Sequence, residues 1–171
     1  QFKWSETEES SNETYAGLSE EDFNADPFKR YNASANDLMK SAQSQAVLTH
    51  EWQVTKNWSV KTDIYQTNFE RNWYKLDRAK DSLGQSISLQ SLIDGMSQNL
   101  LQEDTPDGFL LQMKANNRAY EAKGIQHRGS IQLPGELGQL VYGVRWHEDY
   151  GDRFQWRDGY QLVDGEMQLT D

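Results

Sequence analysis

The chain has 171 residues, a formal net charge of -10 from 17 Lys+Arg against 27 Asp+Glu, no cysteine and three prolines. The length suggests one domain or a piece of a larger one, and the negative charge argues against a nucleic-acid-binding module. The lack of cysteine excludes disulfides, Cys-ligated zinc and thiol nucleophiles. Twenty aromatic residues (6 Trp, 8 Tyr and 6 Phe) in so polar a chain argue against disorder.

Residues 1–43 are expected to form an outer loop. Residues 5–11 are polar and acidic, and residues 19–27 contain turn-forming residues. Aromatic side chains nevertheless recur along this segment, so we expect it to pack against the rest of the chain. Gln1 is not a natural translation start, and a processed or excised N-terminus is therefore expected.

Residues 44–74 are predicted to form a β-hairpin. Apolar residues alternate with polar ones from Ala46 to Val54, and again from Trp58 to Ile64. Lys56 and Asn57 separate the two runs. Alternation with a period of two is typical of strands with one buried face, and a two-residue break is typical of a hairpin turn.

Residues 75–117 break this alternation and are predicted to form a long loop that carries a short helix near residues 87–101. Five apolar residues in this loop fall on one helical face: Leu89, Leu92, Ile93, Met96 and Leu100. Either Ser86 or Ser88 can cap the start of the helix.

A second hairpin is predicted over residues 118–157. Alternation returns from Ile125 to Leu133, a Pro-Gly turn follows, and alternation resumes from Leu140 to Trp146. The last residues, 158–171, are expected to form a loop.

The predicted fold class is all-β, made of antiparallel hairpins with short turns inside the hairpins and long loops between them. This asymmetry is typical of a transmembrane β-barrel, with short periplasmic turns and long extracellular loops. The strands also present an apolar face opposite a face with charged residues, among them Glu51, Lys61, Asp63, Arg128 and Arg145. A soluble β-sandwich or small barrel with one solvated face gives the same alternation, so it stays open as an alternative.

Several strings resemble TonB-dependent outer-membrane receptors of the ferric-dicitrate type. They are residues 12–18 (NETYAGL), 22–27 (DFNADP), 30–34 (RYNAS), 68–77 (NFERNWYKLD), 114–120 (KANNRAY) and 146–156 (WHEDYGDRFQW). In this order, the strings are spread over most of the chain. The resemblance implies a 22-stranded barrel closed by a plug domain, located in the bacterial cell outer membrane and importing an iron chelate or siderophore with energy from TonB.

Full receptors of this type are several times longer than this chain. No plug domain or TonB-interacting segment is expected in it, and Asp171 is not the terminal aromatic of a complete barrel. The sequence therefore suggests an internal barrel segment of about four strands with their extracellular loops. Because closed lipid-facing barrels have at least about 8 strands, this segment would need the remaining strands or another cover for its apolar face.

Metal and catalytic motifs are weak. Asp22, Asn24 and Asp26 resemble the start of a calcium loop, but Pro27 and Ala33 stand where glycine and glutamate are required. The three histidines have no metal-ligand spacing. Acidic residues near Arg153 are interpreted as a charge network. No metal, cofactor or catalytic site is predicted, and the chain is not expected to be an enzyme.

Ligand capture would need cationic and aromatic groups near the outer opening, because ferric chelates are anionic or rich in oxygen. The candidates are Arg71, Trp73, Tyr74, Arg145, Arg153 and Trp156. The alternative is that these arginines neutralise acidic side chains in the same loops.

The sequence thus predicts part of a TonB-dependent receptor whose partners are a ferric chelate or siderophore, TonB and outer-membrane lipid, with no nucleic acid. The alternative function is a soluble, secreted all-β module that binds a ligand such as a carbohydrate, with exposed Trp and Tyr as stacking platforms.

Overall fold

The computed structural model describes residues 1–94 and 98–170, and it is an antiparallel all-β structure with short helices in its connections. In chain order, the elements are β1 (Phe2–Ser11), α1 (Glu20–Ala25), η1 (Asn32–Ser34), β2 (Leu38–Thr55), β3 (Trp58–Lys80), β4 (Ser86–Ser88), α2 (Leu89–Asp94), η2 (Gln98–Leu101), β5 (Leu110–Gln132), β6 (Gln139–Val163) and β7 (Glu166–Leu169). Over the described residues, no helix combines the length and the apolar character needed to cross a membrane.

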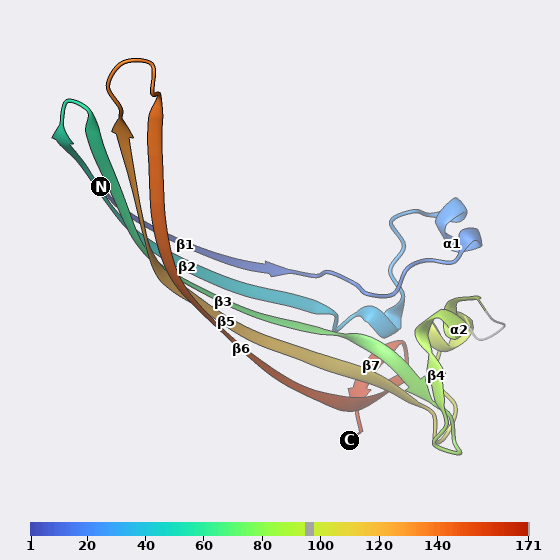
Figure 1. Ribbon diagram of the computed structural model, residues 1–171. Helices are drawn as coiled ribbons and strands as arrows, with labels where there is room; N and C mark the ends of the chain where they lie inside the picture. Colours follow the sequence, from blue (N-terminus) through green and yellow to red (C-terminus); the bar gives the residue numbers. More distant parts are fainter. Residues whose placement is uncertain (95–97, 171) are drawn as a thin grey trace. The chain divides into compact units, whose positions relative to one another are not determined.

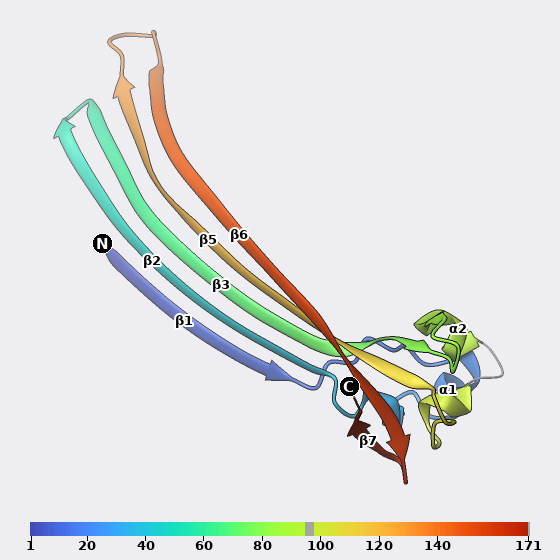
Figure 2. The same ribbon diagram turned by 90° about the horizontal axis from the view of Figure 1, so that it is seen from below.

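Neighbouring strands in the sheet follow the order β1-β2-β3-β5-β6-β7, and β4 pairs with β3 (Figures 1 and 2). In the short β3–β4 pair, Ala79 lies opposite Ile87. In the β6–β7 pair, Leu162 lies opposite Met167. The chain therefore runs mainly as a meander, in which consecutive strands are neighbours.

The two predicted hairpins and the short helix within a loop are confirmed, although the strands extend beyond the predicted ends. Lys56 and Asn57 form the two-residue turn between β2 and β3. The Oγ of Ser88 accepts a hydrogen bond from the backbone N–H of Ser91 at 3.1 Å, so Ser88 caps α2. Part of the predicted helix, including Met96, lies outside the described residues.

The prediction of a loop over residues 1–43 was wrong, because β1 occupies Phe2–Ser11 and β2 begins at Leu38. In β1, only Phe2 and Trp4 are apolar residues at alternating positions. The rest of the strand is polar and largely exposed. β1 lies at the end of the strand order. A strand in that position needs little apolar sequence, because its backbone hydrogen bonds to one neighbour supply the pairing.

The loops predicted over 75–117 and 158–171 are also shorter than expected. β3 continues to Lys80, β5 begins at Leu110, and β7 forms a hairpin with the end of β6. Asp164 and Gly165 connect β6 to β7 with φ values of 53° and 77°. An Asp-Gly pair in this left-handed conformation favours tight hairpins, so these two residues are the sequence signal for this turn.

The chain divides into two compact units. Unit 1 contains Gln1–Glu8, Ser41–Glu70 and Arg118–Asp152, and unit 2 contains Glu9–Lys40, Arg71–Asn117 and Arg153–Asp171.

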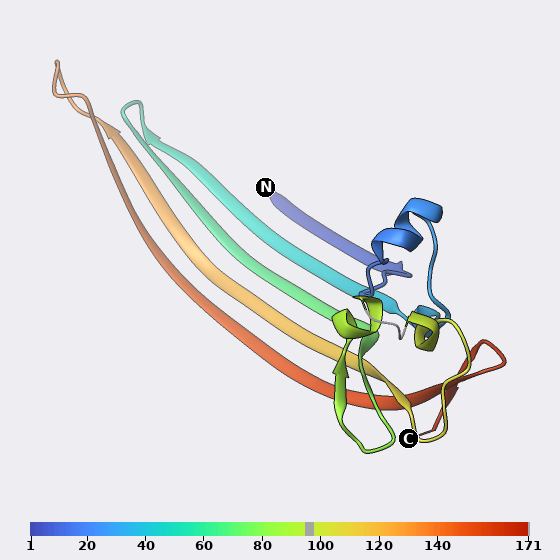
Figure 3. The same ribbon diagram turned by 90° about the vertical axis from the view of Figure 1, so that its right-hand side faces the viewer.

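Unit 2 contains a buried apolar core. The strands contribute Leu76, Leu111, Met113 and Leu162, and α2 contributes Leu89, Leu92 and Ile93. Tyr31 and Ala33, from the connection between β1 and β2, also belong to this core. Helices α1 and α2 lie on the same side of the unit 2 strands (Figure 3). The periodicity that predicted the helix thus places three apolar residues of α2 in the core.

Unit 1 has two chemically different strand faces. On one face, Asp63 accepts hydrogen bonds from Thr49 Oγ1 at 2.6 Å and from Gln126 Nε2 at 3.1 Å, and Lys61 lies 3.0 Å from Glu51. The other face presents large apolar side chains that are at least about 40% exposed: Leu48, Trp52, Ile64, Ile125, Leu140, Val144 and Trp146. Among the described residues of unit 1, only Gly124 and Gly129 are buried.

Candidate functional site

Five of the six candidate ligand-binding residues lie in unit 2, and Arg145 lies in unit 1. Arg71, Trp73 and Tyr74 are on β3, whereas Arg153 and Trp156 are on β6. Because side chains alternate along a strand, Trp73 and Tyr74 point to opposite faces. The unit 2 candidates therefore belong to two separate groups.

The first group is centred on Lys75. Its Nζ lies 3.0 Å from the ring centroid of Tyr15 and 4.1 Å from that of Trp73. The two rings meet edge to face, with centroids 5.5 Å apart and planes at 88°. Trp73 Nε1 also donates a hydrogen bond to the backbone oxygen of Glu13 at 3.2 Å. The ammonium is thus held by two aromatic rings, an arrangement that is favourable when the cation has lost its water.

The electrostatic surroundings of Lys75 are mixed. Burial lowers the pKa of the Lys75 ammonium, since the charged form loses solvation, and the positive charges of Lys114 and Arg71 lower it further. Asp77 and Asp37 act in the opposite direction without restoring the ordinary value.

Asp77 is part of an ionic cluster with two arginines. Its Oδ2 lies 3.0 Å from Arg157 Nε and 3.0 Å from Arg78 Nε. Burial alone would raise the pKa of the Asp77 carboxyl, but the hydrogen bonds from Arg157 and Arg78 outweigh burial and hold that pKa below its usual range. The cluster links β3 to β6 and keeps Asp77 charged.

The second group, which contains Tyr74 and Trp156, is centred on Asp158. The Oδ2 of Asp158 accepts a hydrogen bond from Tyr74 Oη at 2.6 Å and another from Trp156 Nε1 at 3.1 Å. Tyr74 Oη also contacts Tyr160 Oη at 3.1 Å. Burial, followed by the bonds to Asp158 and Tyr160, raises the pKa of Tyr74 far above its ordinary value. Tyr74 and Tyr160 pack against the apolar core, so this group stabilises unit 2.

Arg71 lies on the face of β3 that carries Trp73, opposite the face of Tyr74. The Nε of Arg71 is buried and has no hydrogen-bond partner among the residues that the structure describes. Arg153 is the first residue of β6 that belongs to unit 2, and it is not free of interactions.

Arg145, in unit 1, lies near Tyr65. Its Nε donates a hydrogen bond to Tyr65 Oη at 3.1 Å, and its guanidinium carbon lies 5.9 Å from the Tyr65 ring centroid. Tyr65 Oη is also 2.6 Å from His147 Nδ1. Arg145 is therefore bonded to Tyr65, which lies on the same face of the strands.

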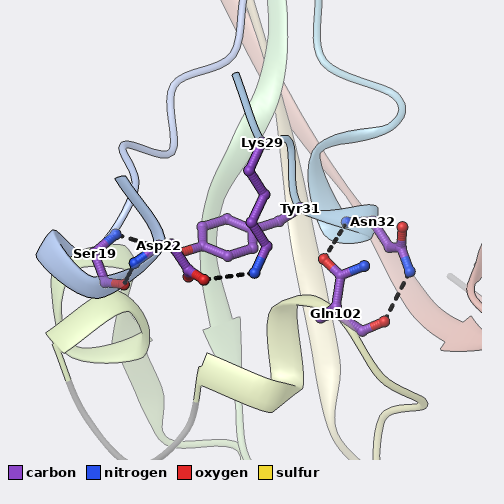
Figure 4. A network of polar contacts seen from close by, with 6 residues as sticks. All are labelled: Ser19, Asp22, Lys29, Tyr31, Asn32 and Gln102. Atoms are coloured by element: carbon purple, nitrogen blue, oxygen red, sulfur yellow. Dashed lines mark hydrogen bonds and ion pairs between the residues drawn. The ribbon is translucent and has the colours of Figure 1, made fainter. Parts of the chain in front are cut away.

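The connection between β1 and β2 is positioned by a polar network (Figure 4). Tyr31 Oη donates to Asp22 Oδ2 at 2.6 Å, and Lys29 forms an ion pair with Asp22. Asn32 Nδ2 donates to the backbone oxygen of Gln102 at 2.8 Å, which ties this connection to the one before β5. Hydrogen bonds from Lys29 and Tyr31 lower the pKa of Asp22. Asp22 is thus paired with Tyr31 and Lys29.

Asp37 fixes the same connection to β3. This buried carboxylate accepts the backbone N–H of Leu76 at 2.7 Å through Oδ1 and that of Tyr15 at 3.2 Å through Oδ2. Burial raises the pKa of Asp37, although both backbone donors oppose that rise. The side chain of Asp37 thus holds the backbone of Tyr15 close to that of Leu76, the residue that follows Lys75.

Within residues 1–94 and 98–170, no three side chains of His, Cys, Asp or Glu lie close enough to bind a metal ion. The groups that act on Lys75 beside Trp73 include the cations Arg71 and Lys114, whose chemistry suits an anion rather than a metal ion. The chain matches no protein-family model, and no curated protein matches it.

The residues missed in the sequence are Lys75, Asp77, Lys114 and Arg157, together with Tyr15 and Asp158. Alternation could have revealed some of them, because Arg71, Trp73, Lys75 and Asp77 fall at every second position of β3. The partnership of Lys75 with Tyr15 has no sequence signal, since 60 positions separate the two residues in the chain.

Proposed function

We propose that this chain is part of a TonB-dependent outer-membrane receptor that binds and imports an iron chelate or a similar nutrient. The observation that carries the proposal is the exposed apolar face of unit 1. On β6, Val144 is 70% exposed and Trp146 is 55% exposed, and the other face of this strand carries Arg145, which is hydrogen-bonded to Tyr65. In water this face would cost free energy at about 25 cal/mol per Å² of apolar surface, whereas lipid removes that cost.

Aromatic residues near the hairpin turns support the same reading. Trp52 and Trp58 flank the turn at Lys56 and Asn57, and Trp58 Nε1 donates a hydrogen bond to Tyr142 Oη at 3.1 Å. Tyr and Trp are favoured at membrane interfaces, where the ring meets hydrocarbon and the polar atom meets water or a partner.

The lengths of the strands also support it. β3 and β5 have 23 residues each, and β6 has 25. A tilted strand crosses a bilayer in about 9–11 residues, so each strand has more than enough residues to cross the bilayer and continue beyond it. The buried core of unit 2 fits the extramembrane part of such strands, because it is organised as in a protein surrounded by water.

The ligand-binding part of the proposal rests on the cationic groups of unit 2. The positive charges of Arg71 and Lys114 both act on Lys75. Guanidinium and ammonium groups suit the oxygen atoms of an anionic chelate. Trp73 adds an apolar contact beside them.

Single-cysteine spin labelling tests the membrane assignment, since the chain has no cysteine of its own. Labels at Leu140→Cys and Val144→Cys probe the apolar face, and Lys61→Cys and Gln126→Cys probe the polar face. The full chain is refolded into lipid vesicles. We expect the first pair of labels to be accessible to oxygen dissolved in the bilayer, and the second pair to a water-soluble nickel chelate.

Equal accessibility of both faces to the nickel chelate would overturn the membrane assignment. A monomer that is stable in buffer without lipid or detergent and that binds a glycan would support the soluble carbohydrate-binding alternative instead. For the nutrient, ferric citrate binding by the vesicle-bound chain is measured by quenching of tryptophan fluorescence.

A further inference from the structure

Lys75 is a buried cation without an acidic partner. Its exposed fraction is 8%, and within the described residues it forms no ion pair. Its ammonium instead contacts the faces of Tyr15 and Trp73. Removing an ammonium from water is costly, and aromatic faces recover only part of that cost. This ammonium would therefore gain from contact with an anion.

Tyr15 is the group that separates Lys75 from solvent on one side. The side chain of Tyr15 is 49% exposed, although its ring centroid is only 3.0 Å from Lys75 Nζ. An aromatic ring that is half exposed on a buried ammonium forms a cover over it. Moving this one ring away would open Lys75 to solvent without disturbing the apolar core, to which Tyr15 does not belong.

The segment that carries Tyr15 is held by few bonds. Trp73 Nε1 donates to the backbone oxygen of Glu13, and the backbone N–H of Tyr15 donates to Asp37. The hydrogen bond from Arg30 Nη1 to the backbone oxygen of Asn12, at 3.3 Å, is exposed. Residues 12–15 contain no helix or strand. Opening this segment breaks the hydrogen bond from Tyr15 to the buried Asp37 and the contacts of the Tyr15 ring, while Asp37 keeps its bond from Leu76.

The groups around Lys75 favour a negative charge at the place Tyr15 covers. Arg71 and Lys114 add positive charge, as their effect on the pKa of Lys75 indicates. The Nε of Arg71 is buried and without a partner among the described residues, so a donor is available for a ligand oxygen. Two acidic groups act on Lys75 in the opposite direction. Asp77 is already bonded to Arg157 and Arg78, and Asp37 accepts the backbone N–H groups of Leu76 and Tyr15.

We propose that Lys75 recognises an anionic group of the ligand, and that Tyr15 competes with this group by covering the ammonium in the free protein. Ligand binding then requires residues 12–15 to move away from β3, so Tyr15 sets both the affinity and the charge selectivity of the site. This proposal rests on the proposed function, because it concerns how that receptor would admit its ligand.

The chemical accessibility of Lys75 tests the cover directly. The full chain in lipid vesicles is treated with an acetylating reagent, and the rate at each lysine is followed by mass spectrometry of peptides. We expect Tyr15→Leu to raise the acetylation rate at Lys75 strongly and to leave the rate at the exposed Lys40 unchanged. Tyr15→Phe keeps the ring and should leave Lys75 protected. Phe28→Leu, at a 93% exposed residue in the same connection, is the matched control.

Ligand binding tests the competition. The probes are ferric citrate, which is anionic, and a neutral ferric trihydroxamate. Because a cation–π contact contributes about 0.5–2 kcal/mol, Tyr15→Leu should tighten ferric citrate binding about 2- to 30-fold. Lys75→Met should abolish this gain, whereas Lys75→Arg should retain part of it. Binding of the neutral chelate should respond to neither change.

Two results would overturn the proposal. One is an unchanged acetylation rate at Lys75 in Tyr15→Leu, which would mean that Tyr15 is not the cover. The other is weaker ferric citrate binding in Tyr15→Leu, which would mean that Tyr15 supports the site rather than competing for it. Either result leaves the proposed receptor function standing if the spin labels on the apolar face are in lipid, so the two failures are distinguishable.

Discussion

Apolar side chains in unit 2 are buried together, with Leu76, Leu111, Met113 and Leu162 fully inaccessible, whereas many large apolar side chains of unit 1 are exposed. Val144, on the same strand as Leu162, is 70% exposed. The same strands therefore supply a core in one unit and an uncovered apolar face in the other.

This difference shows that apolar residues on the same strands need not all be covered by the chain itself. Unit 2 has helices and connections that cover its strands, so its apolar groups are removed from water by the chain itself. Unit 1 has no such cover among the described residues, and its apolar face needs a different solvent. Lipid is the solvent that our proposal assigns.

The largest effect should come from the core of unit 2. Leu111→Ala leaves a cavity at a fully buried position and should lower the free energy of unfolding by about 2–5 kcal/mol. The matched change in unit 1, Leu140→Ala, removes a side chain that is 51% exposed and should cost well under half as much. Urea unfolding of the full chain in vesicles measures both. Equal losses would erase the distinction between the units.

A charge on the apolar face of unit 1 should have the next largest effect. Val144→Arg places a guanidinium where lipid is expected and should cost about 2–4 kcal/mol near the middle of the bilayer. Gln126→Arg, on the face that contains Asp63, is the control and should be nearly neutral. The free energies of unfolding from vesicles decide between them. A harmless Val144→Arg would contradict lipid contact at this face.

The turn between β6 and β7 offers a smaller effect. Gly165 has a φ of 77°, and a left-handed conformation costs a residue with a Cβ roughly 1–2 kcal/mol. Gly165→Ala should therefore destabilise unit 2 by about that amount. Gly17→Ala is the control, because Gly17 has no such φ and open space around it. Thermal unfolding of the two variants should separate them, and equal midpoints would refute the role of this turn.

The smallest effect should come from the ionic cluster in unit 2. Asp77→Asn removes the negative charge between Arg157 and Arg78, whose side chains are 38% and 39% exposed, so solvent screening limits the loss to about 1 kcal/mol. Because the folded state lowers the pKa of Asp77, its stabilising contribution is present above the unfolded pKa of about 3.9. That contribution is lost as the pH falls through the folded pKa.

The free energies of unfolding of Asp77→Asn and the unchanged chain should thus converge in acid, and they should differ most near neutral pH. Denaturant unfolding at several pH values measures this convergence. A difference that persists in strong acid would mean that Asp77 stabilises the fold by packing rather than by its charge.

Much of the fold was accessible from the sequence. The alternation around Lys56 and Asn57 gave the first hairpin, and the spacing of Leu89, Leu92 and Ile93 gave the helix in the long connection. The first strand was missed because only Phe2 and Trp4 carry its pattern, and an edge strand needs little more. The Asp-Gly pair at Asp164 and Gly165 is a sequence signal for the β6–β7 hairpin.

Less of the candidate site could be predicted from the sequence. Trp73 was identified from its residue type and position, but the sequence could not pair it with Glu13 or Tyr15. The sequence predicted that Tyr74 binds ligand. In the structure, Tyr74 is hydrogen-bonded to Asp158 and packs against the apolar core, so it stabilises unit 2. Side-chain partners on strands that are distant in sequence depend on register, and single-sequence alternation does not define register.

The sequence by itself determined the all-β character, the antiparallel hairpins and the two-faced strands, because these follow from a local period of two along the chain. Only the tertiary structure decided which apolar residues form a core and which stay uncovered, since burial depends on what the connections between strands pack against. It also decided that Tyr15 covers Lys75. That contact joins two distant segments, and Asp37 binds the backbone of both segments, at Tyr15 and at Leu76.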